Sequence, residues 1–350
     1  MHEVMRRCKT TLVLLSIAAA LAVVKPLRLG AQRAGGPNKP QVPRTVWGQP
    51  DLQGVWDFAS NTPLQRPPEL GRQAEYTEAE LAGKMKEAVD RRAQQDAGVV
   101  YQDYNRAWTD DVKMSRQTSL IIDPPDGRLP AYTPLAQKWY AEQEAIRKGV
   151  AGDSPTPGGW VEDLGHRGLF FRCIVGFNAG PPMLPQSYNQ NVQIFQAPDH
   201  VALLHEMVHN ARVAWLDKRP HVSSRITGYN GDARGRWEGD TLIVESINFA
   251  KEVYDLRQGG GMRPNANGTF ALLERFTRTS PDTLLYEYTL TDPSWYTAPV
   301  TVRIPMRKNP EPIYEYACHE GNMGLTHSLE AERSREAKEK NQEGANRPPP

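Results

Sequence analysis

The chain has 350 residues, with 42 Lys and Arg against 41 Asp and Glu. This balance excludes a strong overall field that would attract nucleic acid or an anionic membrane, and no block of basic residues stands out. We therefore expect no nucleic acid as a partner.

The first 31 residues have the pattern of a secretory signal peptide. Three basic residues within the first nine precede an apolar run from Leu12 to Val24, and small residues follow around Ala31. The run is too short to span a bilayer, so we expect cleavage after Ala31; a retained anchor is the alternative. No later apolar run could span a membrane, which predicts a periplasmic or secreted protein without membrane insertion. Residues 32–50, rich in Pro, Gly, Gln and Arg, indicate a linker.

Residues 51–165 predict a mixed α/β region. Thr77 and Glu80 have the spacing of a capping box, in which each side chain can accept from the other residue's backbone amide. Apolar residues at helical spacing follow them, and Pro134 suits the first turn of a second helix. The expected elements are a strand at 52–58, a helix at 77–95, a strand at 119–123 and a helix at 134–148.

Beyond residue 190, within the region 166–327 that we expect to form the barrel, the pattern changes to a period of two. Leu284, Tyr286, Tyr288 and Leu290 alternate with more polar residues, and residues 300–306 do the same. Such half-buried strands, separated by turn sequences, predict a mainly β fold: an antiparallel lipocalin-like (calycin-like) barrel or related sandwich, with the helical region as an N-terminal elaboration. The segments Gly54-Val55-Trp56 and Gly235-Arg236-Trp237 are similar to the Gly-x-Trp that opens lipocalin-like barrels. We expect residues 328–350 to be a charged, disordered tail with a frayed helix.

Two cysteines remain once Cys8 leaves with the signal peptide. An even pair in an oxidising compartment predicts a disulfide between Cys173 and Cys318. Two buried free thiols are the alternative.

The segment His205-Glu206-Met207-Val208-His209 matches HExxH. On a helix, both histidines could bind one zinc ion while Glu206 activates a water. On a strand, they would lie about 13 Å apart, too far to share an ion. Turn sequences at 197–200 and 217–220 favour a strand or hairpin over 201–216. An unbroken strand would place Glu206, Val208, Asn210 and Arg212 on one face, with both histidines on the other.

The zinc hypothesis also lacks a third ligand. In the extended metallopeptidase motif a Gly and a His follow at fixed steps, but Arg212 and Trp215 occupy those positions. We therefore expect no cofactor. A zinc hydrolase with His205 and His209 as ligands remains the alternative.

A series of motifs covers most of the chain from residue 51 to about 327. They are Arg172-Cys173-Ile174, Pro182-Met183-Leu184-Pro185, Tyr188-Asn189, Glu206-Met207-Val208-His209-Asn210-Ala211-Arg212-Val213, Arg219-Pro220-His221, Gly231-Asp232-Ala233-Arg234-Gly235-Arg236-Trp237-Glu238-Gly239-Asp240-Thr241-Leu242, Glu274-Arg275-Phe276-Thr277-Arg278 and Tyr314-Glu315-Tyr316-Ala317-Cys318-His319-Glu320-Gly321-Asn322. Together they resemble an abundant family of exported proteins of soil bacteria, notably acidobacteria. The resemblance does not indicate which activity, if any, the protein has. It does imply that various residues occupy the position of His205, which favours the strand.

Five polar residues are candidates for catalysis: Glu206, His209, Arg212, His319 and Glu320. If they meet at a barrel mouth, they could bind a small organic molecule or transform it by metal-independent acid/base chemistry, with Glu206 and His209 as the reacting groups. Glu206 and His209 have opposite parity on a strand, so sharing a pocket requires a bulge. The alternatives are a structural network that pairs Glu206 with Arg212, and a structural or interaction protein of the cell envelope.

Overall fold

The computed structural model describes residues 42–98, 113–147, 168–186, 188–256 and 261–345. The predicted signal peptide, residues 1–31, lies outside them. The strands are β1 (Gly54–Asp57), β2 (Ile121–Asp123), β3 (Asn191–Gln196), β4 (His200–His205), β5 (Ala211–Trp215), β6 (Asp232–Glu238), β7 (Thr241–Ile247), β8 (Glu252–Asp255), β9 (Gly261–Pro264), β10 (Ala271–Ser280), β11 (Thr283–Thr291) and β12 (Val300–Asn309). The α-helices are α2 (Glu78–Gly98), α3 (Pro134–Arg147), α4 (Gly168–Phe171) and α5 (Gly324–Ala345), and the 3₁₀ helices are η1 (Pro68–Leu70), η3 (Met207–His209) and η5 (Ala266–Gly268).

A closed β-barrel forms the centre of the described fold. Nine of the described strands follow one another in the order β1-β3-β4-β5-β6-β7-β10-β11-β12, and β12 pairs again with β1 to close the ring. The predicted mainly β barrel is therefore confirmed. The barrel is not confined to residues 166–327, because β1 lies between β3 and β12 and supplies the closing strand. A closed ring leaves no free edge, which explains why this short N-terminal strand is needed.

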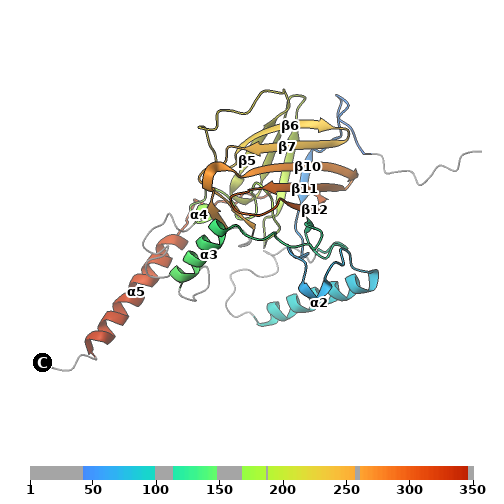
Figure 1. The fold of residues 1–350 in the computed structure, drawn as a ribbon. Coiled ribbons are helices and arrows are strands. Elements are labelled where there is room, and N and C mark those ends of the chain that lie inside the picture. Colours follow the sequence, from blue (N-terminus) through green and yellow to red (C-terminus); the bar gives the residue numbers. More distant parts are fainter. Residues whose placement is uncertain (1–41, 99–112, 148–167, 187, 257–260, 346–350) are drawn as a thin grey trace, which may run out of the picture. The chain divides into compact units, whose positions relative to one another are not determined.

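The long strands alternate buried and partly exposed residues, as the period of two predicts. On β11, Leu284, Tyr286, Tyr288 and Leu290 are all buried, and β10 and β12 flank this strand in regular antiparallel register. Figure 1 shows β6, β7, β10, β11 and β12 side by side in that order. The inward side chains of the barrel strands belong to one hydrophobic core. An inward polar residue on any of these strands is therefore enclosed by the core.

The junction of β5 and β6 departs from the antiparallel expectation. These strands are parallel, and the ladder between them consists of one pair, Trp215 with Arg234. A parallel pair needs a long return connection, here residues 216–231. The connection packs closely on the junction, since a Cβ at Gly235 would lie 2.5 Å from Cδ2 of Leu216.

The two predicted helices of the N-terminal region are present. At the start of α2 the backbone amide of Thr77 donates to Glu80 over 2.8 Å, and that of Glu80 donates to the Thr77 hydroxyl over 3.3 Å. The capping box therefore works as its spacing predicted. Residues 324–345 form helix α5, which begins before residue 328, where we expected a frayed helix in a charged tail, and is longer than that expectation. The Ala, Glu, Lys and Arg that make this segment polar also have high helix propensity.

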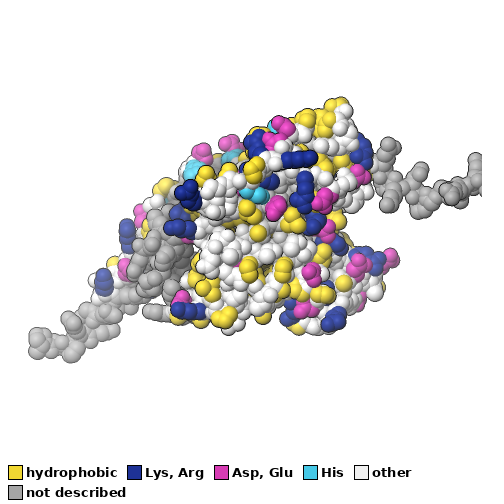
Figure 2. All heavy atoms as spheres, turned by 45° about the horizontal axis from the view of Figure 1, so that its top comes forward, with side chains coloured by type: hydrophobic (Ala, Val, Ile, Leu, Met, Phe, Trp, Pro, Cys, Tyr) yellow, Lys and Arg dark blue, Asp and Glu magenta, His cyan; other side chains and the backbone are white. Residues whose placement is uncertain are grey.

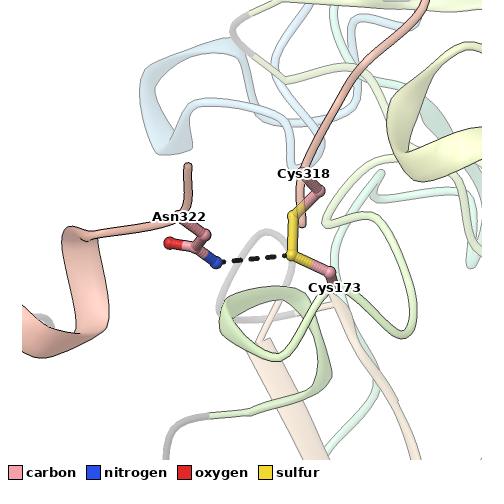
Figure 3. Close-up of a disulfide and its surroundings, with 3 residues drawn as sticks. All are labelled: Cys173, Cys318 and Asn322. Carbon is pink, nitrogen blue, oxygen red and sulfur yellow. Dashed lines mark hydrogen bonds between the residues drawn. A yellow bond between two sulfur atoms is a disulfide. The ribbon is translucent and has the colours of Figure 1, made fainter. Parts of the chain in front are cut away.

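The predicted disulfide joins Cys173 to Cys318, two residues 145 positions apart (Figure 3). It fastens the segment after β12 to the turn that follows α4, and the side-chain amide of Asn322 lies 3.5 Å from the Cys173 sulfur. In the chain-entropy model, closing a loop of this length stabilises the fold by about 5 kcal/mol.

The Gly54-Val55-Trp56 segment also has the expected structural character. Gly54 has a φ of 122°, a conformation that favours glycine, and the indole of Trp56 is fully buried. Its N–H donates to the Leu52 carbonyl over 2.8 Å, and the guanidinium of Arg278 lies 5.3 Å from the ring. Trp56 is thus a fixed part of the core where the barrel closes.

Candidate functional site

Polar residues interrupt the apolar lining of the barrel. His205 on β4, Arg212 on β5, Ser246 on β7, Glu274 on β10 and Tyr286 on β11 are buried, and each has the strand parity of neighbouring core residues. We call these five residues the barrel cluster. Burying charged groups in such a core is costly unless they are paired, so their contacts decide what the barrel cluster can do.

Arg212 and Glu274 form a buried bidentate ion pair. Nη2 of Arg212 donates to Oε1 of Glu274 over 2.5 Å, and Nη1 donates to Oε2. Burial lowers the pKa of Arg212, but the attraction of Glu274 outweighs it and the net pKa is raised. Arg212 therefore stays charged, and its bidentate contact with the Glu274 carboxylate balances that charge within the pair.

Tyr286 completes this pair. Its hydroxyl donates to Oε1 of Glu274 over 2.7 Å, and burial followed by the charge of Glu274 raises the pKa of the phenol. The backbone amide of Met183 donates to the same hydroxyl over 3.3 Å. Because Met183 belongs to the loop before β3, the ion pair is linked to that loop. The same loop accepts a hydrogen bond at the Gly180 carbonyl from Asn210, at the end of the β4–β5 turn.

His205 is the least satisfied member of the barrel cluster. Its side chain is 1% exposed, and among the described residues neither ring nitrogen has a hydrogen-bond partner. Burial, with a smaller effect of the Arg212 charge, lowers the pKa of His205 to about 3. The ring is therefore neutral at physiological pH and presents one donor and one acceptor.

Two more polar atoms of the barrel cluster are buried and unsatisfied. Nε of Arg212 and the hydroxyl of Ser246 have no hydrogen-bond partner within the described part of the chain. Native proteins pair the large majority of buried polar atoms, so several unpaired atoms on one inner surface need an explanation. The sequence did not lead us to Ser246, Glu274 or Tyr286. Glu274 was detectable in principle, because it has the parity of the apolar residues Leu272 and Phe276.

Of the five residues predicted from the sequence, Arg212 is the one in the barrel cluster. Glu206 is buried elsewhere: its Oε2 accepts from Asn191 over 2.6 Å and its Oε1 accepts from the backbone amide of Tyr314 over 3.1 Å. The hypothesis that Glu206 pairs with Arg212 is wrong, because Glu274 holds that guanidinium. Glu206 instead joins β3, the β4–β5 turn and the segment after β12.

His209, His319 and Glu320 are exposed. His209 ends the turn between β4 and β5, whereas the other two belong to the segment near Cys318. The expected meeting of five side chains at a barrel mouth is therefore not what the structure has. Their catalytic role stays a prediction, and any such role would have to operate at the surface.

The HExxH segment does not form an α-helix. His205 ends β4, and Met207–His209 is a short 3₁₀ turn in which Val208 and His209 have φ values of 49° and 51°. The predicted hairpin is confirmed, but the predicted faces are wrong beyond Glu206. The turn reverses the parity, so Arg212 and Ala214 point inward with His205, while His209 is exposed. Among the described residues there is no cluster of three or more His, Cys, Asp or Glu arranged to hold a metal.

Comparisons with protein-family models, with curated proteins and with solved structures found no match to this chain. The molecule is therefore defined by its own features, a closed β-barrel with a buried polar cluster. No helix within the described residues is long and apolar enough to cross a membrane. On the face shown in Figure 2, Lys and Arg side chains are interspersed with Asp and Glu, as the balanced composition suggests.

Proposed function

We propose that the barrel binds a small, uncharged, polar organic molecule at the barrel cluster. The observation that carries this proposal is a set of buried atoms without a hydrogen-bond partner in the described part of the chain: both ring nitrogens of His205, Nε of Arg212 and the Ser246 hydroxyl. Each would cost free energy if left without a partner, and a bound molecule with matching groups would remove that cost. Enclosed sites in β-barrels commonly serve this purpose.

The charges of the barrel cluster support an uncharged ligand. Arg212 and Glu274 neutralise one another, and His205 is neutral because its pKa is lowered to about 3. A net charge on the ligand would then be buried without a counter-charge, which is strongly unfavourable. Unpaired donors on Arg212 and His205, an acceptor on His205 and the amphoteric hydroxyl of Ser246 match a ligand with hydroxyl, carbonyl or amide groups.

Binding is better supported than acid/base catalysis. An efficient general acid or base has a pKa near the working pH. The pKa of His205 is lowered to about 3, and those of Arg212 and Tyr286 are raised. These groups keep one protonation state at neutral pH, which suits fixed hydrogen bonds.

A thermal-shift screen tests the proposal. The mature protein is screened with matched uncharged and anionic metabolites: alcohols, sugars, amides and carboxylates. A ligand that binds the folded state at 100 times its Kd stabilises it by about 2.7 kcal/mol, which raises the melting temperature measurably. We expect the stabilising compounds to be uncharged, and Ser246→Ala or His205→Phe to abolish the shift.

Thr289→Ala is the matched control. It also removes one hydroxyl, but Thr289 lies on the outer face of β11, where its hydroxyl is 3.0 Å from that of Thr301. Ligand shifts should survive this change. Shifts produced only by anions would contradict the proposal, as would shifts that persist in both Ser246→Ala and His205→Phe.

We further propose that the protein acts in the periplasm or outside the cell. The Cys173–Cys318 disulfide supports this location, because such bonds persist in oxidising compartments. The N-terminal pattern of charged and apolar residues supports export. Fractionation of cells that express the full chain, followed by mass determination of the mature N-terminus, tests both the location and the cleavage after Ala31.

A further inference from the structure

A second buried charge pair lies where the β8–β9 hairpin meets the β11–β12 connection. Arg263 of β9 has a fully buried side chain, and its Nη1 donates to Oδ2 of Asp292 over 2.7 Å and to the Pro264 carbonyl over 3.3 Å. This arrangement uses the donors of only one of the three guanidinium nitrogens. None of these residues belongs to the barrel cluster.

Asp292 has little capacity left for another donor. Its Oδ1 accepts from the hydroxyls of Thr269 and Ser294, each over 2.7 Å, and from the Ser294 backbone amide over 3.2 Å. Its Oδ2 holds Arg263. The carboxylate therefore fixes the guanidinium and is itself fixed by its neighbours.

The unpaired groups at Arg263 are donors. Among the described residues, Nε and Nη2 of Arg263 have no hydrogen-bond partner, and neither does the buried hydroxyl of Tyr296. The N–H of Nε and one N–H of Nη2 point in the same direction, forming the planar fork with which arginine holds two oxygens at once. Burial, and then the nearby charge of Asp255, raises the pKa of Tyr296, so its hydroxyl keeps its proton.

Aromatic rings surround the guanidinium. Cζ of Arg263 lies 4.6 Å from the ring centroid of Trp295, 5.5 Å from that of Phe270 and 5.7 Å from that of Tyr296. Trp139 on α3 packs edge-on against Trp295 at 5.4 Å and is partly exposed. Trp295 thus contacts both the buried guanidinium and a partly exposed ring on α3.

The charges around Arg263 indicate which class of ligand could bind at the fork. Arg263 and Asp292 neutralise one another, and Asp255 is close enough to influence Tyr296. An anion placed here would add negative charge to a buried, already balanced pair. Uncharged oxygens can accept from the fork and from Tyr296 without that cost, while apolar ring carbons pack on the aromatic side chains.

We propose that Arg263 and Tyr296 form a second binding site, which takes an uncharged molecule with two adjacent oxygens, the vicinal diol of a sugar or polyol. The fork of Arg263 donates to both oxygens, and the Tyr296 hydroxyl donates to one of them. The aromatic side chains contact the carbon skeleton.

Three probes with the same ring test this proposal: trans-1,2-cyclohexanediol, cyclohexanol and cyclohexanecarboxylate. Binding is followed by the ¹H–¹⁵N resonance of the Arg263 side-chain Nε–H, assigned by its loss in Arg263→Lys, and by calorimetry. The diol should shift this resonance. Cyclohexanol can accept from only one arm of the fork. Its affinity should be at least about 10-fold lower than that of the diol, because a hydrogen bond to a charged group is lost.

Variants distinguish a loss of ligand binding at the fork from a general loss of stability. Arg263→Lys keeps the charge opposite Asp292 but removes the fork, and it should weaken diol binding about 10- to 100-fold. Tyr296→Phe removes a single hydroxyl and should also weaken binding, which keeps the test meaningful if Arg263→Lys folds poorly. Thr289→Ala, on the outer face of β11, should bind the diol as the wild type does.

Three results would overturn the second site. One is a carboxylate that binds while the diol does not, and another is a diol that binds no better than cyclohexanol. The third is diol binding that is lost in Ser246→Ala yet unchanged in Arg263→Lys, which would assign the diol to the barrel cluster. If the proposal for Arg263 fails, the thermal-shift screen still tests the barrel cluster, because the two sites share no residue.

Discussion

Glu206 and the barrel cluster are both buried and polar, but their contacts differ. Both carboxylate oxygens of Glu206 accept hydrogen bonds, from Asn191 and from the backbone amide of Tyr314. In the barrel cluster the Arg212–Glu274 pair is joined, yet His205, Ser246 and Nε of Arg212 keep atoms without a partner in the described residues. The first arrangement is complete without a ligand, whereas the second is not.

This difference is the reason for proposing the barrel cluster, and not Glu206, as a binding site. Glu206 links three segments that are distant in sequence, and its hydrogen bonds account for its burial. The barrel cluster contains a charge pair that could be equally structural, but the neighbouring unpaired atoms are not explained by the fold. Residual hydrogen-bonding capacity, more than burial or charge, therefore marks the candidate site.

Of the changes considered, breaking the Arg212–Glu274 pair should lower the free energy of unfolding most. Glu274→Ala leaves a buried guanidinium without its partner and should destabilise the fold by about 3–5 kcal/mol. The double variant Arg212→Met/Glu274→Leu removes both charges and should cost much less. Chemical denaturation of the three proteins measures the difference. Equal losses in the single and double variants would mean that the pair itself contributes the stability.

Glu206→Gln should lower the free energy of unfolding by a smaller amount. The amide retains one acceptor oxygen, so one of two hydrogen bonds to a charged group is lost, at a cost of about 1.5–3 kcal/mol. Hydrogen exchange should show faster exchange of the Tyr314 amide. Ligand shifts from the barrel should remain, because Glu206 is not in the barrel cluster. If a folded Glu206→Gln protein lost those shifts, Glu206 would contribute to ligand binding, and its separation from the barrel cluster would be contradicted.

His205 should make stability depend on pH. Its folded pKa of about 3 lies below the value of 6.5 for an unperturbed histidine. Between these pH values the unfolded state binds more protons, so stability falls as the pH falls. From pH 7 to pH 5 this contribution is about 2 kcal/mol, and it should disappear in His205→Gln. Denaturation curves at both pH values, compared between the two proteins, measure it; equal pH dependence would contradict the burial of this ring.

His319→Ala should have the smallest effect. The side chain is exposed, and substitutions at such positions usually change stability by less than about 0.5 kcal/mol. Glu320→Gln, at the next exposed position, serves as the companion variant. Ligand shifts should be unaltered in both. If either variant abolished a shift while folding normally, the surface beside Cys318 would have to be part of the ligand-binding site.

Local patterns predicted much of the fold. The alternation on β11 and β12 placed their inward residues correctly, and the capping box at Thr77 and Glu80 located the start of α2. These signals depend on near neighbours in the chain, so a single sequence contains them. The faces around the β4–β5 turn failed for a local reason as well: two successive residues with positive φ reversed a parity that a regular strand would keep.

The candidate site was only partly predictable. Arg212 was named from the sequence, but its partner Glu274 lies 62 residues later on a strand that is not adjacent to β5. The sequence indicated that His205 is dispensable as a zinc ligand, whereas in the structure its ring is buried and has no hydrogen-bond partner among the described residues. Neither fact follows from spacing, because both depend on which inward faces meet across the barrel.

The sequence by itself predicted the class of fold, a disulfide between Cys173 and Cys318 and the starts of α2 and α3, because these follow from periodicity, composition and capping. Only the tertiary structure decided that β1 closes the barrel and that Glu274, not Glu206, holds Arg212. It also decided that His205 is buried without a hydrogen-bond partner among the described residues. The physical reason is that closing a barrel brings together residues that are distant along the chain. The interior they share then decides which polar atoms are satisfied.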